Sequence, residues 1–463
     1  MGLFTVILAA GLGTRMKSAV PKVLHAINGK AMICHVVDAV RALKPDKIVV
    51  VVSPGSDQIQ DALKDDRITF AIQREPKGTA DALKAAAEKL TAKTGTVLVL
   101  SGDTPLVRHS TLQKLLTTHK RKKEDLSILS FMVEGDHAYG RIMREGGSVI
   151  SIVENRDADQ EQKKIKEVNS GVYALESSVL KLLKQIEVNP GKGEYYLTDI
   201  VGIAARNGFR VGSHVLGDET ELTGINTRKE LCMAGLSLRD RTVSKWLERG
   251  VSFVDMKTVF LDPNVEIGMD TIIYPNVIIE GQSAIGKGCV IYPNTRIVDS
   301  TVGNGVTIKD STVIESSIIK DAATIGPFAH LRPDSVIGAS AKIGNFVEIK
   351  KSVIGNGAKA SHLSYLGDAE IGDNVNIGAG TITCNYDGVN KSKTIIEEDC
   401  FIGSDTQLVA PVKVGKGAYV GAGSTITKDV PPLALAVSRA PQRNFDGWAK
   451  VKSCKKNHKS SKG

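Results

Sequence analysis

Residues 267–297 read IGMDTIIYPNVIIEGQSAIGKGCVIYPNTRI, and an isoleucine stands at every sixth position from Ile267 to Ile297. A helix repeats about every 3.6 residues and a half-buried strand about every two, so a period of six fits neither. The period is typical of a parallel β-helix, in which three hexads make one coil and the aliphatic residue points inward. A run of short antiparallel strands, the alternative, would alternate with a period of two.

The ladder slips and resumes, over 325–349 and again over 396–426, with Leu or Val at some inward positions. Gly or another small or polar residue often follows the inward one, as a tight corner requires. We therefore expect a β-helix from about Val251 to Val430, ended by Pro431 and Pro432. Two interruptions, residues 361–368 and 383–393, are interpreted as loops that project from the coil, where sites are often built.

The first ~225 residues alternate strand-like and helix-like runs, and the strand-like runs are apolar throughout. Continuous apolar strands indicate burial on both faces, hence an α/β domain with a Rossmann-like, mostly parallel sheet. Ligands of such sheets bind outside the carboxyl ends of the strands. The expected strands are 4–10, 47–53, 96–100, 126–133 and 172–175, and the expected helices include 31–43 and 79–90.

The chain divides into four expected segments. Residues 1–226 form the α/β domain and 227–250 a linking helix that opens with a capping box of Thr227 and Glu230. Residues 251–448 form the β-helix domain with a C-terminal segment. Residues 449–463 are a basic tail, which is typical of disorder.

Charge and composition exclude several classes of function. The net charge is +9, but six lysines lie in the tail without an acidic residue, so the rest of the chain carries only +3. Aromatic residues make up 5% and no recognition motif is present, so we expect no nucleic-acid binding. No run reaches the ~18 apolar residues that span a bilayer, so we expect no membrane insertion. The six cysteines have no C-x-x-C spacing, which favours reduced thiols and a cytoplasmic location.

A glycine-rich loop, Leu8-Ala-Ala-Gly-Leu-Gly-Thr-Arg-Met16, follows the first expected strand, with Pro21-Lys22 after it. Backbone amides of such a loop donate to phosphate oxygens. A dinucleotide fingerprint would need Gly in place of Met16, and a Walker A loop would need Gly before Lys17. What remains is a loop with Arg15 and Lys22 as cations for a polyphosphate, or a structural loop whose cations are incidental.

Residues 97–103, VLVLSGD, deliver Asp103 at the end of a buried strand. This acid could simply cap the next helix. In a site for phosphoryl-group transfer it would instead bind Mg²⁺, a hard ion that takes carboxylate and phosphate oxygens.

Of the nine histidines, only His362 lies in an expected projecting loop with Tyr and Asp close by. A lone loop histidine is more often solvated than catalytic. Imidazole titrates near neutrality, however, and could take a proton from an amine that attacks a thioester. Arg332 and Lys350 offer charges for a sugar phosphate. Cys384 is interpreted as structural, because direct acyl transfer needs no nucleophile and no base lies beside it.

The loop with Arg15 and Lys22 resembles the signature of sugar-phosphate nucleotidylyltransferases. The strings SHLSYLGD at 361–368, TCNYDG at 383–388 and DAEIGDNVNIGAG at 368–380 resemble a narrower family. Its members are bacterial bifunctional enzymes that combine an N-acetylglucosamine-1-phosphate uridyltransferase with a glucosamine-1-phosphate acetyltransferase. The resemblance covers the chain up to about Trp448.

The resemblance implies uridylyl transfer from UTP to N-acetylglucosamine 1-phosphate in the first domain, with release of pyrophosphate. Arg15 and Lys22 would act in catalysis, and Asp103 and Asn226 would bind Mg²⁺. The residues implied in binding UTP and UDP-N-acetylglucosamine are Leu8, Ala9, Ala10, Gly11, Lys22, Gln73, Gly78, Thr79, Gly140, Glu154, Asn169 and Asn226.

For the second domain the resemblance implies a left-handed β-helix, a homotrimer, and acetyl transfer from acetyl-CoA to glucosamine 1-phosphate with His362 as base. The product of both steps would supply peptidoglycan and lipopolysaccharide precursors. The implied contacts of glucosamine 1-phosphate are Arg332, Lys350, Tyr365 and Asn376, and those of acetyl-CoA are Ala379, Asn385, Tyr386, Ser404, Ala422 and Arg439.

Two positions depart from the family pattern: Leu12 stands where many relatives have Lys, and Ser101 where some have Tyr. Neither change removes Arg15, Lys22 or Asp103. Two other hypotheses compete with a two-site enzyme. One is a nucleotidylyltransferase whose β-helix serves only assembly or regulation, and the other is a non-enzymatic assembly protein, which would not retain these three residues.

Overall fold

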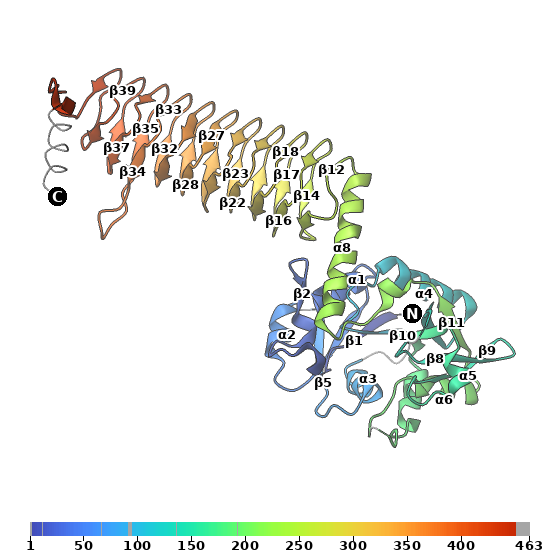
Figure 1. Cartoon of the computed structure of the whole chain (residues 1–463). Helices are drawn as coiled ribbons and strands as arrows, with labels where there is room; N and C mark the ends of the chain where they lie inside the picture. The colour runs from blue at the N-terminus through green and yellow to red at the C-terminus, as the bar shows by residue number, and fades with distance from the viewer. Residues whose placement is uncertain are drawn as a thin grey trace, which may run out of the picture. The chain divides into compact units, whose positions relative to one another are not determined.

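The structure, a computed structural model, describes residues 2–11, 13–65, 67–90, 95–135, 137–191 and 193–450. Leu12 and residues 451–463, most of the expected basic tail, lie outside the described residues. The chain forms two compact units, Met1–Ser244 and Lys245–Gly463 (Figure 1).

The first unit is built on a nine-stranded sheet. Its strands are β1 (Gly2–Leu8), β4 (Lys47–Val52), β5 (Ile68–Ile72), β6 (Gly95–Ser101), β7 (Leu126–Met132), β8 (Arg141–Glu145), β9 (Ser148–Val153), β10 (Glu167–Glu176) and β11 (Val211–Val215). The main path runs β11-β7-β10-β6-β1-β4-β5, and β8 and β9 extend it from β10. Strand β10 is antiparallel to both β6 and β7, whereas the other pairs along the path are parallel, so the sheet is mostly parallel as predicted.

Helices cover both faces of this sheet, which explains its continuous apolar strands. On β4, Val49 and Val51 belong to one buried cluster while Val50 belongs to another. Leu83 of α3 packs in the first cluster and Val37 of α1 in the second. The helices and turns of the unit are η1 (Thr14–Met16), η2 (Lys22–Leu24), α1 (Met32–Arg41), α2 (Asp57–Ala62), α3 (Thr79–Ala87), α4 (His109–Lys122), α5 (Gln160–Lys163), η3 (Val179–Gln185), α6 (Asp199–Arg206) and α7 (Glu219–Leu222), with a small hairpin of β2 (Ala26–Ile27) and β3 (Lys30–Ala31).

Helix α8 spans Arg228–Glu248 and begins with the predicted capping box. The Glu230 amide donates to the Thr227 hydroxyl (3.2 Å), and the Thr227 amide donates to the Glu230 carboxylate (3.0 Å). Both contacts satisfy amides that the first turn of a helix leaves without partners. Within the described residues, no helix is long and apolar enough to cross a bilayer.

The second unit is a parallel β-helix whose strands form three sheets, here named faces 1, 2 and 3. Face 1 consists of β12 (Ser252–Phe253), β15 (Ile272–Ile273), β18 (Val290–Ile291), β21 (Thr307–Ile308), β24 (Thr324–Ile325), β27 (Lys342–Asn345), β30 (Lys359–His362), β33 (Asn376–Ile377), β36 (Phe401–Ile402), β39 (Tyr419–Val420) and β41 (Leu435–Ala436). Face 2 consists of β13 (Phe260–Leu261), β16 (Ile278–Glu280), β19 (Arg296–Val298), β22 (Val313–Glu315), β25 (His330–Leu331), β28 (Glu348–Lys350), β31 (Tyr365–Gly367), β34 (Ile382–Cys384), β37 (Gln407–Val409) and β40 (Thr425–Ile426). Face 3 consists of β14 (Glu266–Ile267), β17 (Ala284–Ile285), β20 (Thr301–Val302), β23 (Ser317–Ile319), β26 (Ser335–Ile337), β29 (Val353–Ile354), β32 (Ala369–Ile371), β35 (Thr394–Ile396) and β38 (Val412–Val414).

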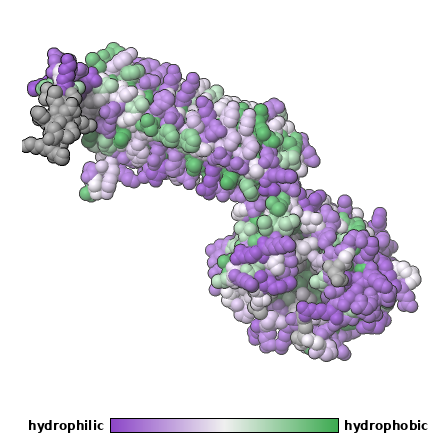
Figure 2. All heavy atoms as spheres, in the orientation of Figure 1, coloured by the Kyte–Doolittle hydropathy of each residue, from purple (hydrophilic) through white to green (hydrophobic). Residues whose placement is uncertain are grey.

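The isoleucine ladder forms the interior of this unit. Ile267 pairs in register with Ile285, and Ile273 with Ile291, so each inward residue stacks on the next coil. One apolar cluster runs from Trp246 to Val430 along the whole β-helix. The outer surface drawn in Figure 2 is mainly hydrophilic, with hydrophobic side chains scattered over it. The hexad period therefore predicted the core of this unit correctly.

Residues 361–368 do not form a projecting loop, so that interpretation was wrong. They continue the regular coil through β30 and β31, and Asn345 pairs with His362 only 17 residues on. The hexad pattern fades because Ala360 and Leu366 take the inward positions, with exposures of 1% and 0%. The coil that carries residues 383–393 is longer than the others. Equivalent positions in it, Asn374 and Asp399, are 25 residues apart, compared with 17 between Asn345 and His362.

The two prolines do not end the β-helix. Strand β41 follows Pro431 and Pro432 and pairs with β39 through Leu435 and Ala436. Proline lacks an amide donor, but the chain crosses a corner there, where the ladder does not need one.

Candidate active sites

The glycine-rich loop after β1 closes around Lys22. Gly13 has a φ of 61°, and a Cβ at this position would lie 2.6 Å from the Cβ of Lys22. Both the backbone conformation and the close approach favour glycine. From α8, Arg228 donates to the carbonyl of Met16 (3.3 Å) and so fixes the far end of the loop. Arg15 lies between these points in η1 with an exposed side chain.

Three predicted site residues meet beyond the carboxyl ends of β1 and β6. The Lys22 ammonium donates to the Asp103 carboxylate and to the side-chain oxygen of Asn226 (3.2 Å). Asp103 follows β6, and its backbone carbonyl accepts from the Ile225 amide (2.9 Å). Ligands commonly bind at this edge of a parallel sheet.

Asp103 and Asn226 fit a magnesium ion. Their oxygens already converge on one cation, the Lys22 ammonium, and a carboxylate with an amide carbonyl suits a hard ion. In the described part of the chain, no three or more His, Cys, Asp or Glu side chains gather as a metal site. Two protein ligands would leave the other positions to phosphate oxygens and water, which is how Mg²⁺ is commonly bound.

Two neighbours hold these oxygens in place. The Ser101 hydroxyl donates to Asp103 (2.6 Å), so the residue that departs from the family pattern supports the carboxylate here. The backbone amide of Asn226 donates to the Glu230 carboxylate (2.6 Å), which ties Asn226 to the cap of α8. The sequence suggested the capping box but not its link to the site.

Gln73, Gly78 and Thr79 form a second group, after β5 and at the start of α3. The Gln73 side-chain amide donates to the carbonyl of Gly78 (3.0 Å) and to Asp81 (3.0 Å). Gly78 has a φ of 103°, and a Cβ there would lie 2.4 Å from the Tyr195 carbonyl oxygen. Asp81 thus orients the Gln73 side-chain amide, and no sequence motif pointed to this role.

Gly140, Glu154 and Asn169 form a third group around β8 and β10. The backbone amide of Asn169 donates to the Gly140 carbonyl (2.9 Å). A Cβ on Gly140 would lie 3.7 Å from the Glu154 carboxyl carbon. Glu154 accepts from the Thr198 hydroxyl (2.9 Å), and the Asn169 side chain donates to the Tyr173 hydroxyl (2.7 Å). Burial raises the pKa of Tyr173, so its hydroxyl remains protonated.

In the second unit, basic side chains gather at the corner between faces 2 and 3. Arg332 follows β25 and donates to Glu348 (2.8 Å), and this contact raises the pKa of Arg332. Contact with the Lys391 amine, followed by the charge of Arg332, lowers the pKa of Lys350. Tyr365 lies one coil beyond Glu348, and a Cβ on Gly367 would lie 2.4 Å from its hydroxyl. The sequence missed Lys391, which lies in the lengthened coil.

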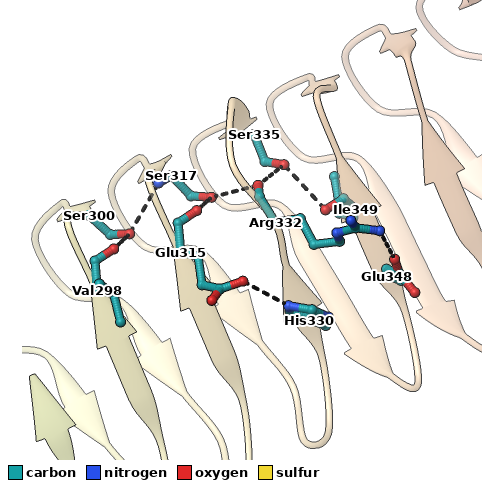
Figure 3. A network of polar contacts seen from close by, with 9 residues as sticks. All are labelled: Val298, Ser300, Glu315, Ser317, His330, Arg332, Ser335, Glu348 and Ile349. Atoms are coloured by element: carbon teal, nitrogen blue, oxygen red, sulfur yellow. Dashed lines mark hydrogen bonds and ion pairs between the residues drawn. The ribbon is translucent and has the colours of Figure 1, made fainter.

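A ladder of buried serines supports this corner (Figure 3). The hydroxyls of Ser317 (3.1 Å) and Ser335 (2.7 Å) both donate to the carbonyl of Arg332. Ser352 donates to the carbonyl of Lys350 (2.9 Å) in the same way. Beside them, His330 contacts Glu315 (3.2 Å) on face 2. The backbone that carries the two cations is therefore fixed from inside the coil.

His362 lies at a different corner, between faces 1 and 2. Its Nδ1 contacts the Asn345 side-chain oxygen (2.7 Å), and its ring is exposed. The inward residues of face 1 pair in register from coil to coil, and His362 stands two residues after one of them. Three of the predicted acetyl-CoA contacts stand at the same position in later coils: Ala379, Ser404 and Ala422. Arg439 donates to the carbonyl of Ala422 (2.6 Å) at the end of this column. Small side chains thus occupy successive corners of this column.

Asn376 lies on face 1 in β33, which pairs with β30, the strand that ends in His362. Other predicted residues lie apart from His362 within the chain. Asn385 lies with the cations, because its side chain donates to Asp368 (2.5 Å) beside Lys350, and Tyr386 is 59% exposed. Burial raises the pKa of the Cys384 thiol, which disfavours a thiolate nucleophile, in keeping with a structural role.

Comparison with known proteins gives matches along most of the chain. Residues 5–168 match the model of the MobA-like NTP transferase domain. Residues 256–332 match the GMPPB C-terminal domain, and residues 316–351 and 393–428 match the bacterial transferase hexapeptide repeats. The first unit is thus a nucleotidyltransferase domain, and the second is a left-handed parallel β-helix of hexapeptide repeats.

Curated relatives match nearly end to end and carry the name "Bifunctional protein GlmU". The relative from Thermodesulfovibrio yellowstonii is 54% identical over 448 residues, covering 96% of this chain and 99% of its own. The one from Heliobacterium modesticaldum is 47% identical over 447 residues, covering 96% and 97%. The one from Clostridium beijerinckii is 45% identical over 452 residues, covering 97% and 99%.

Proposed function

The chain belongs to the family of bifunctional GlmU proteins, and we propose that it makes UDP-N-acetylglucosamine in two steps at two separate sites. It is a bifunctional transferase: it acetylates glucosamine 1-phosphate with acetyl-CoA and then transfers a uridylyl group from UTP to the product. The observation that carries the assignment of two sites is the separation of chemistry. Lys22, Asp103 and Asn226 meet in the first unit, whereas His362 and the cations around Lys350 belong to the second.

In the first unit, a phosphate oxygen of N-acetylglucosamine 1-phosphate attacks the α-phosphorus of UTP. The new P–O bond forms as the bond to the β-phosphate breaks, and pyrophosphate leaves. Arg15 and Lys22 would neutralise the charge that builds on the pyrophosphate. The amides of Ala10 and Gly11 would donate to it, since the Ala9 amide is already bonded to the Val51 carbonyl (2.8 Å). Positioning and charge carry such a reaction, because it needs little covalent help from the protein.

Asp103 and Asn226 would hold Mg²⁺, with Lys22 moving from these oxygens to the phosphates. When bound, Mg²⁺ supplies positive charge to phosphate oxygens. Gln73 with Gly78 and Thr79 would hold the uracil ring, and Gly140, Glu154 and Asn169 the sugar. Their backbone and side-chain contacts to one another support these roles.

In the second unit, the amino group of glucosamine 1-phosphate attacks the thioester carbonyl of acetyl-CoA. The C–N bond forms, the C–S bond breaks, and the thiolate of CoA leaves. His362 takes the proton of the amine through Nε2. Arg332, Lys350, Tyr365 and Asn376 would bind the sugar phosphate, and Ala379, Asn385, Tyr386, Ser404, Ala422 and Arg439 would bind acetyl-CoA.

A homotrimer assembled through the β-helix fits these positions. His362 and Lys350 lie at opposite corners of face 2 within one chain, so a second copy would bring the missing half of a site. Large apolar side chains on the outside of the β-helix, such as Phe328 and Phe346, suit such an interface. The enzyme's substrates favour a cytoplasmic location, and so do the five described cysteines, which are all free.

Two substitutions in the full chain test the proposal. Asp103→Asn should lower uridylyl transfer by about 100-fold or more, because it removes the carboxylate that would hold Mg²⁺, and should leave acetyl transfer unchanged. His362→Ala should do the reverse. Pyrophosphate release and CoA release, measured on the same preparations, report the two activities. Loss of both activities in either variant would contradict the assignment of separate sites.

A further inference from the structure

Asn345 and His362 occupy equivalent positions in successive coils. They pair in register, and the Leu363 amide donates to the Asn345 carbonyl (3.0 Å). Gly344 permits this close approach, since a Cβ there would lie 1.9 Å from the Ser361 carbonyl oxygen. Asn345 is thus held directly beneath the imidazole by the backbone of both coils.

The contact between Asn345 and His362 defines which atom donates the hydrogen bond and which accepts it. The side-chain oxygen of Asn345 lies 2.7 Å from Nδ1 of His362, and an amide oxygen can only accept. The neutral ring must then carry its proton on Nδ1, which leaves Nε2 with a free lone pair. Such a contact selects the tautomer and the orientation that a general base needs, as the aspartate of a hydrolase triad does.

We propose that Asn345 is a positioning residue for acetyl transfer, which holds His362 in the tautomer with Nε2 free to accept the proton of the attacking amine. The inference rests on the proposed role of His362. Strands β27 and β33 pack against β30. Besides His362, the titratable side chains on these three strands are Lys342 of β27 and Lys359 of β30. Neither lysine can replace the amide oxygen, because an ammonium only donates.

The test is the pH profile of kcat and kcat/KM for acetyl transfer in full-length variants. Asn345→Ala should lower kcat by about 10- to 100-fold with little change in KM for glucosamine 1-phosphate. Asn345→Asp keeps an acceptor of the same size, so it should retain more activity. Its carboxylate stabilises the protonated ring, so the acid limb of the profile should move up by about one pH unit.

Asn304→Ala is the matched control. Asn304 also joins two coils, since its side-chain oxygen accepts from the Lys287 amide (2.9 Å), but it lies at another corner. It should leave the profile unchanged, and uridylyl transfer should be normal in all variants. A uniform loss in Asn345→Ala and Asn345→Asp, without a shift of the acid limb, would reduce Asn345 to a structural contact.

His362→Ala separates the two possible failures. If this variant still transfers acetyl groups at the wild-type rate, the proposed base is wrong and the inference fails with it. If it is inactive while both Asn345 variants follow the wild-type profile, the base stands and only the inference about Asn345 is overturned.

Discussion

Lys350 has two other cations beside it, and this affects when it loses its charge. Contact with the Lys391 amine, followed by the charge of Arg332, lowers its pKa, because neighbouring positive charges disfavour another one. Deprotonation therefore begins at a lower pH than for an isolated lysine. A site that binds phosphate through Lys350 should weaken over the same range.

Lys391→Met should have two effects on acetyl transfer. At neutral pH the KM for glucosamine 1-phosphate should rise about tenfold, because a positive charge beside Lys350, the proposed phosphate ligand, is lost. The alkaline rise of KM should move to higher pH, since Lys350 then keeps its proton longer. Lys393→Met, in the same lengthened coil but paired with Glu370, is the control. An alkaline limb that stays in place would contradict the coupling of the two lysines.

At this scale the sequence predicted which residues carry charge but not which of them touch. Lys22, Asp103 and Asn226 are far apart in the chain. They meet because β1 and β6 end, and α8 begins, at the same edge of the sheet. Ser101 looked like a lost contact, yet it supports Asp103. Lys391 carried no signal, because a lysine in an irregular stretch is usually a solvated surface residue.

Strands β7, β8, β10 and β11 meet around one carboxylate, Glu167. Ser130 (2.8 Å), Ser213 (2.7 Å) and Arg144 (3.0 Å) all donate to it. Burial works to raise the pKa of Glu167, but these three contacts together outweigh it and lower the pKa. Its stabilising effect is therefore present above about pH 4.5, the ordinary value for glutamate, and is lost as the pH falls through the lowered pKa.

Glu167→Gln should destabilise the first unit by about 1 to 2 kcal/mol at pH 7, because an amide cannot accept all of these contacts. Thermal unfolding at a series of pH values would measure the difference from the wild type. The difference should shrink in acid, where the wild-type carboxylate is itself protonated. Glu145→Gln, an exposed change at the end of β8, should have little effect at any pH. A difference independent of pH would show that lost packing, not charge, is responsible.

Elements with a strong period were predicted well, and irregular ones were not. The hexads gave the core of the β-helix, and continuous apolar runs gave β1, β4, β6, β7 and β10. The short strands β8 and β9 were missed because their polar residues alternate weakly. His362 was assigned to a loop because Ala360 hides the inward position from a search for aliphatic residues, although a small side chain fills the core there.

At the scale of the whole molecule, the two corners of face 2 make a prediction about assembly. His362→Ala and Arg332→Ala should each abolish acetyl transfer. When the two variants are co-expressed, mixed oligomers should regain about one quarter of the wild-type activity, because some sites then combine an intact His362 with an intact Arg332 from another copy. Uridylyl transfer measures the amount of enzyme in each sample. No recovery would place both residues of a site in a single chain.

The family resemblance implied this assembly, whereas the hexad period alone did not. A period fixes what points into the coil, but an interface depends on what points out of it. Exposed Phe328 and Phe346 stand one coil apart and stack, but this spacing does not tell which surface a second copy covers.

The 25-residue coil also bears on how the molecule can change. Despite its extra length, Ile371 pairs with Ile396 and Ile377 with Ile402 as if nothing had been added. A corner of this unit therefore tolerates new chain without disturbing the rungs above and below. Such modularity makes the corners natural places for evolution, or a protein engineer, to graft a new specificity onto an unchanged scaffold.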